Sequence, residues 1–197
     1  FVLKYRLPNS PSLIKPQWAP LQDAQQAIRI VRKEAKKWNI NPTQIGIMGF
    51  SAGGHLASTA ATHYEDVKVT NPVNISYRPD FQILIYPVIS FASYGHKGSR
   101  DNLIGPVISE DQVHYFSNEE HINKSAPPAF LVHAKDDESV PVANSINYYK
   151  QLQENQVASE LYLFEKGGHG TPPATRSTPT NGRASNCVRS DCSPSRT

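Results

Sequence analysis

The first 170 residues of this 197-residue chain contain no cysteine, and the whole chain has one methionine. Both cysteines, Cys187 and Cys192, lie near the C-terminus, where a single C-x4-C pair supplies only two metal ligands. The shortage of cysteine excludes a disulfide-stabilised secreted scaffold, but it leaves the redox compartment open. With 38% apolar residues, a chain of this length can still bury a core of its own.

Long apolar runs are also missing. No stretch of about 18 consecutive apolar residues occurs, so we expect no membrane-spanning helix. The first residues have neither a charged leading region nor a small-residue cleavage site, which predicts no signal peptide within this sequence. Secreted and periplasmic locations both stay open, because an export signal would lie upstream of Phe1.

An excess of charge is absent from most of the chain. Lys and Arg number 20 against 17 Asp and Glu, which leaves a net charge of +3. Residues 171–197 hold four Arg and one Asp, so they account for the whole excess and residues 1–170 are neutral. A neutral body offers no general attraction for phosphate backbones or anionic lipid, and we expect neither a nucleic-acid nor a membrane partner.

The composition changes at residue 171. Pro, Ser, Thr and Arg make up 18 of the last 27 residues, and Val188 is the only aliphatic residue there that is larger than Ala. So little apolar surface cannot offset the entropy of ordering the chain. We therefore predict a domain at residues 1–170 and a disordered tail at residues 171–197. An arginine-rich binding arm and a metal site at the two cysteines are the alternatives.

Short apolar runs alternate with helical patterns up to residue 170. Apolar residues recur at steps of three and four from Leu21 to Trp38, which predicts a helix that ends at Asn41. Further helices are expected at residues 52–62 and from Pro141 onward. Strands are expected at residues 1–7, 45–50, 81–86, 129–134 and 160–164. This alternation predicts an α/β fold with a mostly parallel sheet, helices on both faces, and a site at the carboxyl ends of the strands.

One glycine-rich motif, G-F-S-A-G at residues 49–53, lies between a predicted strand and a predicted helix. A strand that reverses sharply into a helix strains the central residue, and flanking glycines let the two backbones pass. Such a turn projects the Ser51 Oγ at the sheet edge, where the helix N-terminus favours developing negative charge. We predict that Ser51 is a nucleophile, with a plain glycine-rich turn as the alternative.

A serine nucleophile needs a base that removes its proton and a carboxylate that orients the base. Three adjacent acids at residues 136–138 follow a predicted strand, and the residues alone leave open which of them turns inward. His169 follows the last predicted strand between glycines, which allow a tight loop that returns its imidazole to the sheet edge. Asp80 precedes its strand, so we expect it to be a structural cap.

The other six histidines show no metal-ligand spacing. Because the predicted chemistry requires no cofactor, we expect neither a metal nor a cofactor. His55 and His133 are expected to make packing contacts or local hydrogen bonds.

A long connection at residues 88–126 joins two predicted strands at the active end of the sheet. We expect it to cover the site and to shape a substrate pocket. Three of its side chains, Tyr94, Arg100 and Tyr115, are either substrate contacts or ordinary surface residues of the loop.

With these residues identified, the chain resembles the α/β-hydrolase superfamily, and more closely the bacterial esterases grouped with acetyl-xylan and feruloyl esterases. The resemblance covers residues 1–170 and none of the tail. The matching segments are FVLKYRLP at 1–8, LQDAQQAIR at 21–29, IGIMGFSAGGHLAS at 45–58, RPDFQILIYPVIS at 78–90, PPAFLVHAKDDESVPVANS at 127–145 and YLFEKGGHG at 162–170.

The resemblance implies a role for each candidate. In the family pattern H-x-x-x-D-x-x-V-P, the histidine is His133 and the catalytic aspartate is Asp137, with Asp136 as the accompanying acid. Ser51 corresponds to the nucleophile and His169 to the general base. The backbone N–H of Ala52, the residue after the nucleophile, corresponds to one oxyanion donor.

Members of the family also carry an upstream strand and a glycine-rich loop that supplies the second oxyanion N–H. Nothing in residues 1–20 corresponds to them, so we expect this chain to begin inside the domain. The hypothesis from the resemblance is a serine esterase that releases acetyl or aromatic acyl groups from plant polysaccharides. A peptidase related to prolyl oligopeptidases and a catalytically inactive fragment or binding module are the alternatives. The acyl group, the sugar and the oligomeric state stay open.

Overall fold

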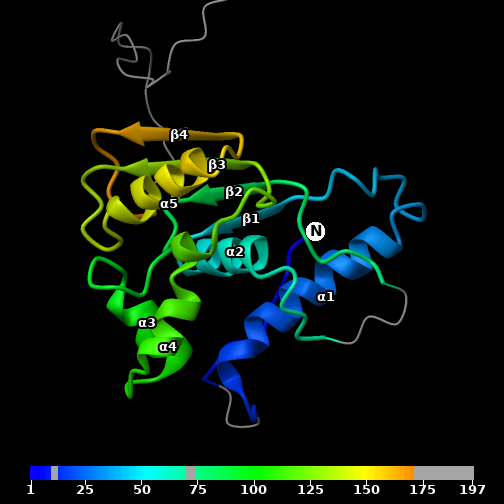
Figure 1. Ribbon diagram of the computed structural model, residues 1–197, viewed down its shortest axis with the longest axis horizontal. Coiled ribbons are helices and arrows are strands. Elements are labelled where there is room, and N and C mark those ends of the chain that lie inside the picture. The colour runs from blue at the N-terminus through cyan, green and yellow to red at the C-terminus, as the bar shows by residue number, and fades with distance from the viewer. Residues whose placement is uncertain (10–12, 70–73, 171–197) are drawn as a thin grey trace, which may run out of the picture.

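The computed structural model describes residues 1–9, 13–69 and 74–170, and the centre of this part is a parallel β-sheet (Figure 1). The tail expected at residues 171–197 lies outside the described residues. The strands are β1 (Ile47–Phe50), β2 (Gln82–Ile85), β3 (Ala129–Ala134) and β4 (Ser159–Phe164), in the spatial order β1-β2-β3-β4. Because every pairing is parallel, all four carboxyl ends lie at one edge of the sheet.

Helices flank the sheet, as expected for an α/β fold. The helices are η1 (Pro16–Trp18), α1 (Ala19–Lys33), α2 (Ala52–Thr62), α3 (Lys97–Ile104), α4 (Glu110–Phe116), η2 (Asn118–His121) and α5 (Ala143–Glu154). One core cluster joins Ala57 of α2 and Tyr148 and Leu152 of α5 to Leu84 and Leu131 of the central strands. Helix α1 packs mainly on α2, and Ile47 of β1 borders the same cluster. The predicted α/β class with a parallel sheet is therefore confirmed, whereas in the described residues the two helices that pack on the strands, α2 and α5, lie on the same face of the sheet rather than on both faces.

The sheet face that points away from α2 and α5 is apolar and partly exposed. Successive strand residues alternate between the faces, and the parallel register keeps paired residues on the same face. Met48 and Phe50 of β1 retain 54% and 47% of their surface, and Phe130 and Tyr162 of the other strands retain about 40%. The packed core of the described chain therefore lies on one side of the sheet.

Residues 1–7, which we expected to form a strand, form none in the structure. The backbone N–H of Arg6 donates to the Asp23 carboxylate at 2.7 Å, and the Arg6 guanidinium pairs with the same carboxylate. Tyr5 packs against the core between α1 and α2. A strand requires a ladder partner, and this segment uses its backbone for a contact with a helix side chain instead.

Helix α1 ends at Lys33, well before the predicted end at Asn41. Residues 34–39 continue as turns, in which Ile40 N–H donates to Ala35 O at 3.0 Å. Asn39 has a φ of 52°, a left-handed conformation that asparagine tolerates and that ends helical geometry. Ala35 lies in a turn but is still buried. The apolar spacing therefore continues past the end of the helix and does not mark where the helix stops.

The connection at residues 88–126 contains α3, α4 and η2. Its own apolar cluster joins Val88, Phe91, Ile104 and Phe116 to Val140, which lies in the loop after β3. Figure 1 shows α3 and α4 beside α2, toward the carboxyl ends of the strands. The connection therefore packs against the edge of the sheet at which sites of this fold form.

The turn from β1 into α2 is tightly packed. Ser51 adopts φ 51° and ψ −122°, and its N–H donates to Ile85 O at 3.1 Å. A Cβ on Gly49 would lie 2.1 Å from the carbonyl oxygen of Gly53, and one on Gly54 would lie 2.6 Å from the side chain of Pro87. A Cβ on Gly53 would meet nothing within 4 Å. Steric need for glycine therefore falls on Gly49 and Gly54, and not on the second glycine of the motif.

Two histidines on α2 or at its end are buried. The Nε2 of His55 lies 2.8 Å from Phe116 O, and its ring stacks on Phe91 with 4.3 Å between centroids. Burial lowers the pKa of His55 to about 4, against the opposing effect of the Phe116 carbonyl. Burial, together with the charge of His121, lowers the pKa of His63 to about 4. Both side chains are therefore neutral at pH 7.

We expect Gly49→Ala to destabilise the protein by roughly 1–3 kcal/mol, because its methyl group collides with backbone that cannot move aside. Gly53→Ala is the matched control, since it adds the same methyl group in open space within a helix and gains helix propensity. Urea unfolding midpoints of the two variants and the parent measure the difference. Equal midpoints for the two variants would contradict the steric argument.

We expect the free energy of unfolding to fall as pH drops from 6.5 to about 4. The unfolded chain protonates both histidines near pH 6.5, whereas the folded chain accepts these protons only near pH 4, so the unfolded state binds more protons in this window. Each histidine contributes on the order of 3 kcal/mol across the full window.

Urea unfolding at pH 7 and at pH 5 measures this loss. The His55→Gln variant removes one titrating group, so its unfolding free energy should depend less on pH than that of the parent. A variant with the parent's full pH dependence would show that His55 does not cause it.

Candidate active site

Ser51 lies at the carboxyl end of β1, where the sharp turn into α2 projects its side chain. Its Oγ is 2.8 Å from His169 Nε2, although 118 residues separate the two in the chain. His169 sits in the loop after β4, in which Gly168 and Gly170 have positive φ values of 58° and 86°. The tight glycine loop expected from the sequence thus returns the imidazole to the sheet edge.

The other imidazole nitrogen of His169 faces a carboxylate. Its Nδ1 lies 2.7 Å from Asp137 Oδ2, in the loop after β3. The Asp137 side chain has no exposed surface, and the His169 side chain retains 26%. Because an ionised carboxylate only accepts hydrogen bonds, Nδ1 carries a proton and Nε2 can accept the proton of Ser51. Ser51, His169 and Asp137 therefore form one continuous hydrogen-bonded series.

The Asp137 carboxylate is fully hydrogen-bonded despite its burial. Its Oδ1 accepts the backbone N–H groups of Ser139 and Val140 at 2.9 and 2.8 Å, and its Oδ2 accepts from His169 and lies 3.2 Å from His133 Nε2. Burial raises the pKa of Asp137. The hydrogen bonds from the Val140 N–H and from His169 lower it by more, so the pKa lies below its usual value. The group is a carboxylate at neutral pH.

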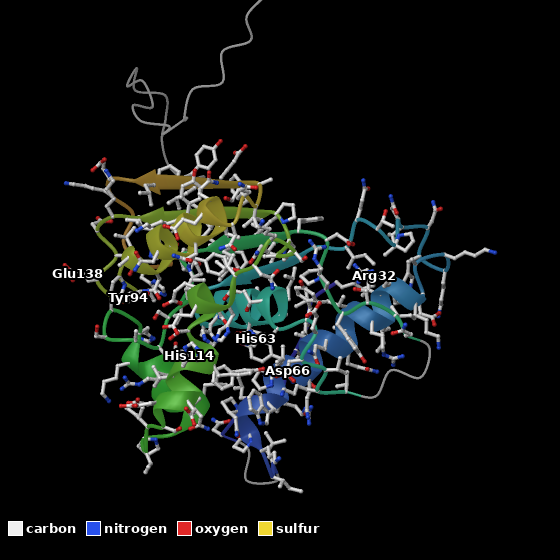
Figure 2. The ribbon with its side chains drawn as sticks, viewed as in Figure 1. Arg32, His63, Asp66, Tyr94, His114 and Glu138 are labelled. Atoms are coloured by element: carbon white, nitrogen blue, oxygen red, sulfur yellow. The ribbon has the colours of Figure 1, made fainter. Side chains whose placement is uncertain are left out.

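The three adjacent acids have three different environments. Asp136 is exposed, and its Oδ1 accepts the backbone N–H groups of Gly167 and Gly168 at 2.9 and 2.8 Å. Glu138 is exposed at the outer edge of the molecule (Figure 2). Asp137 alone among the three lies against His169, while Asp136 supports the loop that carries this histidine.

Two residues near the series were given no role in the site by the sequence, although one of them, His133, is the histidine of the family pattern. Tyr86, directly after β2, has a φ of 37° and places its ring edge-on to His169 with 4.9 Å between centroids. His133 was expected to pack or to bond locally, and it does bond locally, but to Asp137. Position could have pointed to Tyr86, because it ends a strand at the same edge as Ser51.

The residue after Ser51, Ala52, is the first residue of α2 and is exposed. First-turn N–H groups have no carbonyl partner within their helix, and the helix dipole places partial positive charge there. The Ala52 N–H is thus suited in type and position to an oxyanion.

An apolar cavity of about 170 Å³ begins beside Ala52. It lies between the N-terminal segment, the start of α1, α2 and the connection at residues 88–126. Its larger apolar side chains are Tyr5, Leu7, Leu21, Leu56, Phe91, Leu103 and Phe116. The connection therefore contributes walls to this cavity, in line with the expectation that it shapes a pocket.

The three polar side chains considered for substrate contact are engaged within the protein. The hydroxyl of Tyr94 donates to Glu119 at 2.5 Å, and that of Tyr115 donates to Asp66 at 2.6 Å. Arg100 pairs with its neighbour Asp101. Figure 2 shows Tyr94 and Asp66 well apart from each other. None of the three lines the cavity beside Ala52.

The expected structural cap is also present. Asp80 Oδ2 accepts from Arg32 at 2.7 Å and from the Ile45 N–H at 2.8 Å, at the amino ends of the strands. Among residues 1–9, 13–69 and 74–170, no group of three or more His, Cys, Asp or Glu side chains is arranged to hold a metal ion. No helix in the same part of the chain is long and apolar enough to cross a membrane.

Comparison with known proteins finds a matching family and relatives whose names refer to xylan. The sequence profile of the BD-FAE family matches residues 3–152, which include Ser51 and Asp137. The acetylxylan esterase of Xylanibacter ruminicola is 39% identical over 175 residues, which cover 86% of this chain and 34% of that protein. Endo-1,4-beta-xylanase B of Butyrivibrio fibrisolvens is 40% identical over 153 residues, or 77% of this chain and 24% of that protein.

Solved structures agree. The acetyl ester-xyloside bifunctional hydrolase of Caldicellulosiruptor lactoaceticus has a TM-score of 0.77 at 45% identity and covers 86% of this chain, which spans 62% of that protein. The carboxylesterase Cest-2923 of Lactobacillus plantarum has a TM-score of 0.67 at 27% identity. The match covers 86% of this chain and 60% of that protein. The chain thus spans less than two thirds of each of these four proteins. It has the α/β-hydrolase fold, and it belongs to the BD-FAE family.

Proposed function

We propose that this protein is a serine esterase that removes acetyl or aromatic acyl groups from plant polysaccharides. Ser51 is the nucleophile, His169 the general base and Asp137 the acid that orients it. The observation that carries the proposal is the pair of hydrogen bonds through one imidazole, 2.8 Å to Ser51 Oγ and 2.7 Å to Asp137 Oδ2. This is the arrangement by which a hydroxyl becomes a nucleophile at neutral pH.

In the first half of the reaction, Ser51 Oγ attacks the ester carbonyl carbon while His169 Nε2 takes the hydroxyl proton. The carbonyl oxygen becomes negatively charged, and the Ala52 N–H donates a hydrogen bond to it. When the carbon–oxygen bond to the sugar breaks, His169 returns the proton to the leaving alkoxide. Asp137 remains ionised and stabilises the imidazolium that exists between these two transfers.

In the second half, water replaces the sugar. His169 Nε2 takes a proton from a water molecule as the water oxygen attacks the acyl-Ser51 carbonyl. The bond to Oγ then breaks, Oγ receives the proton, and the free carboxylic acid leaves. The same two hydrogen bonds serve both halves, so one geometry supports the full cycle.

The substrate class rests on the relatives and on the cavity. Proteins named acetylxylan esterase and acetyl ester-xyloside bifunctional hydrolase share 39% and 45% identity with this chain. The cavity beside Ala52 is apolar and similar in size to cavities that hold a benzene molecule, so it offers space for a small acyl group. An acylamino-acid-releasing enzyme of rice is 28% identical over 158 residues, which makes a peptidase the second candidate.

We expect a fluorophosphonate probe to modify one residue, Ser51, and Ser51→Ala to abolish this labelling. The variant should also lower ester hydrolysis by a factor on the order of 10⁴ or more, because it lacks the nucleophile. Mass spectrometry locates the label. Faster cleavage of p-nitrophenyl acetate and acetylated xylan than of N-acetylated peptides supports the esterase, and the reverse order supports the peptidase. A folded chain that takes no label would be the inactive module.

The two adjacent aspartates allow a matched comparison. Asp137→Asn should lower hydrolysis by about 10⁴-fold, because an amide opposite Nδ1 stabilises the unproductive imidazole tautomer. Asp136→Asn makes the same chemical change but keeps an oxygen for the Gly167 and Gly168 N–H groups, so we expect a loss below about 10-fold. Rates of p-nitrophenyl acetate hydrolysis by the two variants and the parent protein show which aspartate is the acid. A larger loss in the Asp136 variant would reassign the acid.

A further inference from the structure

The proposed triad does not use one buried histidine that touches it. His133 lies in β3, and its side chain has no exposed surface. Its Nδ1 is 2.8 Å from Ser145 Oγ, at the start of α5. Its Nε2 is 3.0 Å from Val140 O and 3.2 Å from Asp137 Oδ2. The side chain therefore joins a helix, a strand and the loop that carries the proposed acid.

These neighbours determine where the proton of His133 lies. Val140 O is a carbonyl oxygen and only accepts, and the Asp137 carboxylate only accepts as well. Nε2 must therefore carry a proton that is shared between the two acceptors. In a neutral ring, Nδ1 then has a lone pair, so the Ser145 hydroxyl donates to it.

From this geometry we infer that His133, held by Ser145 as the Nε2–H tautomer, is a positioning residue for Asp137. The inference rests on the proposed function, in which Asp137 orients the base His169. His133 and His169 bond to the same oxygen, Oδ2, while the other oxygen accepts two backbone N–H groups. A series of hydrogen bonds then runs from Ser145 through His133, Asp137 and His169 to Ser51.

The contact with Val140 explains why a histidine suits this position. Val140 N–H donates to Asp137 Oδ1, and Val140 O accepts from His133, so both backbone groups of Val140 take part. His133 thus fixes the carboxylate directly and also fixes the backbone that binds its other oxygen. An apolar side chain would fill the space but would leave Oδ2 with one donor and Val140 O with none.

His133 stays neutral, as this role requires. Burial lowers its pKa, which the Val140 carbonyl and Asp137 only partly offset, and His169 lowers it further. The titratable groups that act on it are thus Asp137 and His169. A neutral His133 ring carries no positive charge, so it does not compete with a protonated His169 for the charge of the Asp137 carboxylate.

The tautomer can be measured without turnover. Nitrogen-15 NMR of imidazole-labelled full-length protein should show His133 as a neutral Nε2–H ring from pH 6 to pH 8. The Ser145→Ala variant removes the donor to Nδ1 and should shift the Nδ1 resonance toward that of a free lone pair, while Nε2 stays protonated against its two acceptors. A protonated Nδ1 in the parent protein, or a doubly protonated ring at pH 7, would overturn the inference.

Positioning is tested by the low-field proton on His169 Nδ1, which reports its bond to Asp137. This resonance should shift or weaken in His133→Leu, return toward the parent position in His133→Gln, whose amide keeps a donor, and stay unchanged in Tyr148→Phe. Tyr148 is the matched control, because it lies on α5 like Ser145 and loses one buried hydrogen bond of 2.9 Å to Gln82. An unshifted signal in His133→Leu would refute a positioning role.

Kinetics provide the third measurement. His133→Leu should slow fluorophosphonate labelling of Ser51 by about 10- to 100-fold, the scale of a misplacement near 1 Å, and His133→Gln should recover most of the rate. Loss of a donor to Oδ2 leaves more charge facing His169, so the acid limb of the pH–rate profile should move to higher pH in His133→Leu. Tyr148→Phe should leave the labelling rate and the pH–rate profile unchanged.

The outcomes separate the two proposals. If His133→Leu fails to fold, Ser145→Ala and His133→Gln supply the same comparison. If His133→Leu and Tyr148→Phe slow labelling equally and neither moves the pH profile, His133 has only a structural role. If the parent protein takes no label, the esterase proposal fails, and the NMR signals of His133 and His169 still decide whether His133 positions Asp137.

Discussion

A buried carboxylate must have its lone pairs occupied, and in this protein that requirement falls on Asp137. Water cannot reach it, so each missing donor would cost the folded state the desolvation of a charge. Its four neighbours with N–H groups are Ser139, Val140, His169 and His133. They come from β3, from the loop after β3 and from the loop after β4. The contacts that make the burial of Asp137 tolerable are therefore the same contacts that hold His169 opposite Ser51.

The parallel sheet makes this meeting possible. Parallel pairing sends the carboxyl ends of all four strands to one edge, so the loops after β1, β3 and β4 face one another although 118 residues separate Ser51 from His169. The helices that follow β1 and β3 in the chain supply further groups to the site. Helix α2 gives the Ala52 N–H, and α5 gives the Ser145 hydroxyl that contacts His133. A site of few residues thus depends on elements from most of the described chain.

Elements with strong local signals could be predicted closely from the sequence. The helix at residues 52–62 and the strand at residues 129–134 have the predicted bounds, because a glycine-rich turn marks the first and a short, mostly apolar run marks the second. The predictions failed where the outcome depends on partners. Residues 1–7 have the composition of a strand but use the Arg6 N–H for Asp23, and residues 34–38 keep the helical spacing after the helix has ended.

Within the candidate site, the sequence by itself determined the types and the order of the groups: a serine in a strand-to-helix turn, acids after a later strand, and a histidine between glycines. These are local properties, because backbone strain at Ser51 and loop flexibility around His169 follow from neighbouring residues. The family resemblance implied Asp137, but only the tertiary structure decides physically that Asp137 rather than Asp136 or Glu138 lies against His169, and that His133 bonds to it. Adjacent carboxylates are chemically alike, and which one is buried depends on loop dihedral angles that contacts with other segments impose.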